Sequence, residues 1–222
     1  MRLMTSKAYI AIELVVLTLL VPVTIQQLHI VRYMLPMLWV ISFYCATIHR
    51  LTTGERVRDA WRRSAVNRTN LKPILRYFAL CALFLGVATL ILVPQRLFSL
   101  PLQNPAFWLL IMFAYPLLSV IPQEIIFRLF FMERYKHIFN RREMMILASG
   151  LAFGLAHLIF QNWVAPLLTA VGGVLFALTY SRHKSLALVS LEHALFGDFL
   201  FTVGLGFYFY HGSVAAIAQA AH

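Results

Sequence analysis

Charged side chains are scarce in this chain. They make up only 12% of its 222 residues, whereas 61% of the residues are hydrophobic. So low a charged fraction excludes an ordinary soluble domain, in which about a quarter of the residues are charged. The apolar residues come in runs long enough to cross a bilayer, and no polar stretch of domain size separates them. The composition therefore predicts an all-α, polytopic integral membrane protein that forms a single membrane domain over residues 1–222.

Acidic residues and cysteines are also few. The chain has 8 Asp and Glu against 19 Lys and Arg, a formal net charge of +11. In a soluble protein this excess would indicate a nucleic-acid partner, but in membrane proteins basic residues collect in the loops that stay in the cytoplasm. We therefore expect the lipid bilayer, and no nucleic acid, as a partner. Cys45 and Cys81 both lie in apolar runs and predict neither a disulfide framework nor a metal pattern.

Seven apolar runs are candidates for transmembrane helices. The second run is short for a span and could begin nearer Leu28. The fourth contains Pro116 and Pro122, which free backbone groups that neighbouring helices or a water-filled cavity must satisfy. The seven runs cover about residues 9–26, 34–48, 74–93, 106–131, 144–160, 165–180 and 186–210.

The basic residues fall unevenly between alternate loops. If the N-terminus lies in the cytoplasm, all but three of the 19 basic residues fall on the inner side, half of them in the cluster from Arg50 to Arg76 around the loop of residues 49–72. The positive-inside rule thus predicts a cytoplasmic N-terminus and an outer C-terminus. We expect a multi-pass protein of the bacterial inner (plasma) membrane.

Glu124, His157 and His193 are ionisable side chains that lie well inside apolar runs. An ionisable group at bilayer depth costs about 2.5–3.5 kcal/mol on insertion scales, so it is rarely present for packing alone. A carboxylate and two imidazoles from three helices can form a proton-transfer site, a metal site or both. By helix rise, however, His157 would lie about 20 Å along its span, whereas Glu124 and His193 would lie about 10 Å from the inner surface.

Supporting residues accompany each of these three. Arg128 follows Glu124 by one helical turn, a spacing that favours an ion pair that keeps the carboxylate charged and oriented. The alternative is that this salt bridge has only a structural role. The amide of Gln123 could hold a water or an oxyanion. Gly150 and Gly154 give the fifth span a small-residue face for close helix packing. The remaining supporting candidates are Phe153, one turn before His157, and Glu192 and Asp198 on either side of His193.

The order of these residues resembles the family of CAAX prenyl proteases type II and bacteriocin-processing enzymes (CPBP or Abi proteins). That family carries Glu-Glu-x-x-x-Arg, Phe-x-x-x-His and His-x-x-x-Asn/Asp motifs on successive core helices. Residues 106–210 would form the core, and residues 1–105 carry no motif. The corresponding segments here are Gln123-Glu124-Ile-Ile-Phe-Arg128, Phe153-Gly-Leu-Ala-His157 and His193-Ala-Leu-Phe-Gly197.

The resemblance implies an intramembrane endopeptidase, open towards the cytoplasmic side, that acts on a peptide or membrane-protein segment with or without a lipid. It further implies that Glu124 activates water, while His157 and His193 stabilise the oxyanion or bind a metal such as zinc. Residue type leaves both histidine roles open. Two positions depart from the pattern: Gln123 replaces the first glutamate, and Gly197 replaces the last polar residue.

Two other classes of function remain open from the sequence. Glu124, His157 and His193 could instead form the proton relay of a proton-coupled transporter or channel. Alternatively, because Gln123 cannot accept a proton, the chain could be a catalytically inactive membrane protein of the immunity type that binds a peptide.

Overall fold

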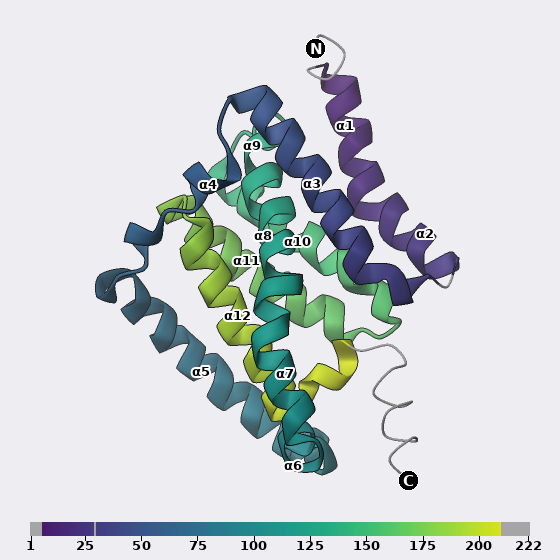
Figure 1. The fold of residues 1–222 in the computed structure, drawn as a ribbon, viewed down its shortest axis with the longest axis vertical. Coiled ribbons are helices and arrows are strands. Elements are labelled where there is room, and N and C mark those ends of the chain that lie inside the picture. The colour runs from purple at the N-terminus through teal and green to yellow at the C-terminus, as the bar shows by residue number, and fades with distance from the viewer. Residues whose placement is uncertain (1–5, 29, 210–222) are drawn as a thin grey trace.

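The computed structural model describes residues 6–28 and 30–209, and these fold into helices joined by short connections, with no strand among them (Figure 1). Seven of the helices are long and apolar enough to cross a membrane. This confirms an all-α, multi-pass membrane protein, while the orientation of its N-terminus stays a prediction. The seven spans are Ala8–Gln27, Met34–Thr53, Arg68–Leu92, Pro105–Arg134, Arg142–Phe160, Val164–His183 and Leu186–Val203.

Several spans are built from more than one helical segment. The first span comprises α1 (Lys7–Val15), a π-helical turn (Val16–Leu20) and α2 (Val21–Gln27). The fourth comprises α7 (Pro105–Tyr115), α8 (Ile121–Glu124) and α9 (Phe131–Arg134), joined by the π-helical segments Pro116–Val120 and Ile125–Phe130. The other helices are α3 (Met34–Thr53), α4 (Val57–Ala60), α5 (Arg68–Leu92), α6 (Ser99–Gln103), α10 (Arg142–Ala156), α11 (Val164–His183) and α12 (Leu186–Val203).

Three predicted span limits were wrong. The seventh span ends at Val203, because Gly204 adopts a left-handed conformation with φ 100° and terminates α12. The second span starts at Met34 as predicted, without the alternative extension towards Leu28, but it ends at Thr53 rather than Ile48, before Gly54, which is left-handed with φ 80°. The third starts at Arg68, six residues earlier than predicted, behind an Asn67 cap. Tyr210, the predicted end of the seventh span and of the core, lies outside the described residues.

The last three spans and the second half of the fourth form the interior of the protein, and α10 packs closely on α11. A Cβ atom added at Gly150 would lie 2.5 Å from Val174 Cγ2, and one added at Gly154 would lie 2.8 Å from Ala170 Cβ. These distances are shorter than van der Waals contact, so only glycine fits at either position without a shift of the neighbouring helix. The two glycines thus form the small-residue face that their spacing predicted.

Substituting Gly154 by alanine should destabilise the protein by about 1–3 kcal/mol, since overpacking a filled interior forces backbone shifts. Gly86→Ala is the matched control, because a Cβ atom there would meet nothing within 4 Å. Thermal unfolding in detergent should therefore show a lower Tm for the Gly154 variant and none of that loss for the Gly86 variant. Equal Tm values for both variants would contradict the close packing of α10 on α11.

A buried ion pair fixes the first span against the core. Arg134 Nε at the end of α9 donates to Glu13 Oε2 on α1 at 2.7 Å, and the Tyr44 hydroxyl on α3 donates to Glu13 Oε1 at 2.8 Å. Removing one partner from such a pair leaves a buried charge uncompensated. These contacts therefore hold α1 and α3 against the end of the fourth span that contains Arg134.

Candidate active site

The fourth span owes its irregular shape to its prolines. Pro116 has no N–H to donate, and the helix widens into a π-helical segment from Pro116 to Val120 and again from Ile125 to Phe130. Such π-helical turns are frequent at functional sites, because they change which side chains face the interior. In this span they leave Gln123, Glu124 and Arg128 all buried.

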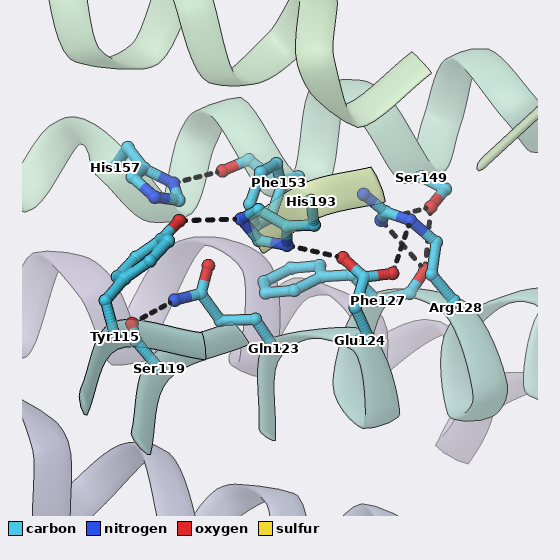
Figure 2. Close-up of polar contacts among 10 residues, drawn as sticks. All are labelled: Tyr115, Ser119, Gln123, Glu124, Phe127, Arg128, Ser149, Phe153, His157 and His193. Carbon is cyan, nitrogen blue, oxygen red and sulfur yellow. Dashed lines mark hydrogen bonds and ion pairs between the residues drawn. The ribbon is translucent and has the colours of Figure 1, made fainter. Parts of the chain in front are cut away.

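Glu124 is completely buried and contacts charged or polar groups on both carboxylate oxygens. Its Oε1 lies 2.8 Å from His193 Nδ1 on α12, and its Oε2 lies 3.3 Å from Arg128 Nε (Figure 2). A carboxylate can only accept a hydrogen bond, so ionised Glu124 fixes the proton of neutral His193 on Nδ1. The Nε2 atom of His193 is then the acceptor.

Arg128 extends this network to the fifth span. Its Nη1 donates to Ser149 Oγ on α10 at 3.1 Å and to the carbonyl oxygen of Phe127 at 3.3 Å. Its guanidinium carbon lies 5.1 Å from the centre of the Phe153 ring, within the range of a cation–π contact. Arg128 therefore neutralises Glu124 and ties the fourth span to α10.

His157 lies at the end of α10, where the helix tightens. Its backbone N–H bonds to the carbonyls of Gly154 and Leu155, so the Phe153 carbonyl is left for its imidazole, whose Nδ1 lies 2.7 Å away. A carbonyl oxygen only accepts, so Nδ1 carries the proton and Nε2 of neutral His157 is also an acceptor.

The Phe153 ring lies between the two histidines. Its centroid is 4.7 Å from that of His157 and 5.4 Å from that of His193. The spans are thus offset enough to bring Glu124, His157 and His193 into one centre, despite the different depths estimated from helix rise. The Phe176 ring of α11 stacks on His193 at 4.6 Å, so four spans contribute to the site.

Tyr115, the last residue of α7, is a site residue that the sequence did not reveal. Its hydroxyl lies 3.0 Å from His193 Nε2, on the opposite side of the ring from Glu124 (Figure 2). A Cβ atom at Gly197 would lie 2.3–2.5 Å from three atoms of the Tyr115 side chain. Gly197 therefore leaves the space that Tyr115 fills. The glycine in place of the expected polar residue was the one sign in the sequence that another side chain could occupy this place. Ser149 was likewise missed.

A largely apolar cavity of about 670 Å³ reaches this centre. Its wall includes His157, His193, Tyr115 and Gln123, together with many Leu, Ile and Phe side chains of all seven spans. Glu124 is not among the lining residues, because His193 lies between its carboxylate and the cavity. Gln123 donates from Nε2 to Ser119 Oγ at 2.6 Å, whereas its Oε1 has no hydrogen-bond partner and points towards Tyr115 and His193 (Figure 2).

The other two predicted supporting residues do not join this centre through a hydrogen bond. Glu192 is buried, does not line the cavity and accepts a hydrogen bond from the Tyr77 hydroxyl of α5 at 2.5 Å. Asp198 would have needed a distorted helix to reach His193, but α12 runs regularly through Gly197, and both ring nitrogens of His193 already have partners.

The donor set does not fit a zinc ion as it is arranged. Among residues 6–28 and 30–209, no group of three His, Cys, Asp or Glu side chains could hold a metal. Zinc in catalytic sites takes three protein ligands, whereas both nitrogens of His193 and one of His157 already form hydrogen bonds. The zinc site stays a prediction, and no chemical step below depends on it.

Comparison with known proteins identifies one family. Residues 105–197 match the family model of the type II CAAX prenyl endopeptidase Rce1-like proteins. No curated protein and no solved structure matches the chain. The matched segment contains Glu124, His157 and His193, and at the level of the family it supports an intramembrane protease of the CAAX type. The match confirms the resemblance drawn from the three motifs: over residues 105–197 the chain is similar to the Rce1-like, type II CAAX prenyl endopeptidase family.

Proposed function

We propose that this protein is an intramembrane endopeptidase in which Glu124 acts through His193 to activate water. The observation that carries the proposal is the 2.8 Å contact between Glu124 Oε1 and His193 Nδ1, with the opposite edge of the imidazole facing the cavity. Such a carboxylate holds an imidazole in one tautomer and stabilises the imidazolium that forms when the ring takes up a proton.

The reaction is a hydrolysis in two steps. In the first, a water oxygen bonds to the scissile carbonyl carbon, its proton passes to His193 Nε2, and the carbonyl electron pair moves onto oxygen. In the second, the carbonyl re-forms, the C–N bond breaks, and His193 returns the proton to the leaving nitrogen. The products are a peptide with a new carboxylate and a peptide with a new amine.

This assignment revises the direct role that the motifs gave to Glu124. Glu124 Oε1 contacts His193 Nδ1, Oε2 forms an ion pair with Arg128 without a hydrogen bond, and the side chain has no exposed surface from which to hold a water. The neutral histidines also offer acceptors, not donors, at Nε2. His157 Nε2 and Gln123 Oε1 are therefore suited to accept hydrogen bonds from the attacking water. Neither atom can donate to an oxyanion, so another group must supply that hydrogen bond.

The substrate that we propose is a peptide or membrane-protein segment carrying a lipid. A largely apolar cavity inside a bilayer suits a hydrocarbon chain, and the matched family is named for prenyl substrates. The bacterial inner membrane remains the proposed location.

Cleavage of a farnesylated peptide that ends in a CAAX sequence is the test of this function. Purified protein in detergent should release the terminal tripeptide, and a chelator should leave the rate unchanged, because a glutamate–histidine mechanism needs no metal. Loss of cleavage on chelation, restored by zinc, would overturn the metal-free mechanism. Binding of the peptide without cleavage would favour the inactive, peptide-binding alternative that Gln123 raised.

A further inference from the structure

Resting on the proposed function, we infer that Tyr115 is a further catalytic residue, the donor that stabilises the oxyanion. Its hydroxyl faces the cavity and lies 3.0 Å from His193 Nε2, the atom to which the water proton is transferred. It is therefore next to the reacting atoms.

The hydrogen-bond roles of the neighbouring groups single out this hydroxyl. Ionised Glu124 accepts from His193 Nδ1, and the Phe153 carbonyl accepts from His157 Nδ1, so neither neutral imidazole donates into the cavity from Nε2. The Tyr115 O–H does donate, and in the resting protein it donates to His193 Nε2. A phenolic hydroxyl is one of the groups that serve as oxyanion donors.

A single shift of this hydrogen bond prepares the site for reaction. When a substrate carbonyl enters the cavity, the Tyr115 O–H transfers its hydrogen bond from His193 Nε2 to the carbonyl oxygen. His193 Nε2 is then free to accept the water proton, and the oxygen that gains negative charge already has a donor. No proton leaves Tyr115 in this step, so charges and atoms balance as in the hydrolysis above.

Gly197 makes this arrangement possible. A Cβ atom at position 197 would lie 2.3–2.5 Å from three atoms of Tyr115, so any side chain at this position would overlap the tyrosine. The Phe201 ring, one turn later on α12, also packs edge-on against the Tyr115 ring at a centroid distance of 5.3 Å. Tyr115 thus occupies the place of the polar residue that the third motif lacks, and it supplies a polar group to the same histidine.

Tyr115→Phe is the direct test, because it keeps the ring and removes only the hydroxyl. With the farnesylated CAAX peptide, kcat should fall about 10²–10³-fold, the effect of losing one oxyanion donor, while KM stays near the wild-type value. A phosphinate analogue of the scissile bond, which carries a tetrahedral anion, should bind more weakly to this variant, and the uncleaved peptide should not. Tyr33→Phe, at an exposed tyrosine, is the matched control and should cleave as the wild type does.

Gly197→Ala gives a second, independent route to the same hydroxyl. It should displace Tyr115 and lower kcat similarly, and the double variant with Tyr115→Phe should be no slower than the slower single variant. A Tyr115→Phe enzyme with wild-type kcat would overturn the role of Tyr115 and leave the endopeptidase intact. A raised KM and a lowered Tm with unchanged kcat would show a structural role instead. A wild-type protein that cleaves nothing would overturn the proposed function itself.

Discussion

Glu124→Gln should lower kcat about 10⁴-fold, the effect of the same carboxylate-to-amide change in a Ser-His-Asp triad. The glutamine is nearly the same size, so the packing of α8 against α12 is kept. Its side chain is uncharged, however, and cannot stabilise an imidazolium 2.8 Å away. Its amide can also donate to His193 Nδ1, which moves the imidazole proton to Nε2 and blocks the acceptor. Steady-state cleavage of the farnesylated peptide measures the effect.

Glu133→Gln is the matched control for this change. Glu133 lies only nine residues further along the same span, but it is partly exposed and pairs with Lys136 at the surface. Its amide variant should cleave at the wild-type rate. If Glu124→Gln kept more than about a tenth of the wild-type kcat, Glu124 would not act through His193 as proposed, because loss of a general-base system costs about 10²–10⁴-fold.

Arg128→Leu should destabilise the folded protein by about 3–5 kcal/mol, because it leaves the Glu124 charge buried without its cation. Both side chains have 0% exposed surface, so no water compensates for the loss. Arg128 also donates to Ser149, and the substitution removes this link between the fourth span and α10. Thermal or denaturant unfolding in detergent should show the lower stability directly.

The double variant Glu124→Leu/Arg128→Leu separates stability from chemistry. Removing both charges of a buried pair is often neutral or stabilising, so the double variant should recover most of the stability that Arg128→Leu loses. It should still not cleave, because His193 has lost its carboxylate. A double variant less stable than Arg128→Leu would contradict this account, because it would mean that Glu124 stabilises the fold through His193 even when Arg128 is absent.

The sequence predicted the helical spans and the three central residues because both follow from local composition. Apolar runs mark bilayer-crossing helices, and an ionisable residue within such a run is conspicuous. The helix limits were less certain, since caps such as Gly54 and Gly204 act through backbone conformation. Hydropathy does not report that conformation.

The roles of the central residues could not be read from the sequence in the same way. Whether Glu124 touches water or an imidazole depends on how α8 packs on α12, which the π-helical segments of the fourth span determine. Tyr115 was missed for a related reason: it lies 78 residues from His193 in the chain and at a helix end rather than in a motif. Gly197 indicated only that the polar residue of the third motif was absent, and not which side chain takes its place.

Hydrolysis of the farnesylated CAAX peptide in ¹⁸O-labelled water, followed by mass spectrometry of both fragments, tests the central claim most directly. The account predicts that the wild-type protein places one ¹⁸O atom in the new carboxylate of a single turnover, and that Glu124→Gln and His193→Ala release no fragment. Peptide that binds to the wild-type protein but stays intact, or labelled product from the His193→Ala protein, would contradict it.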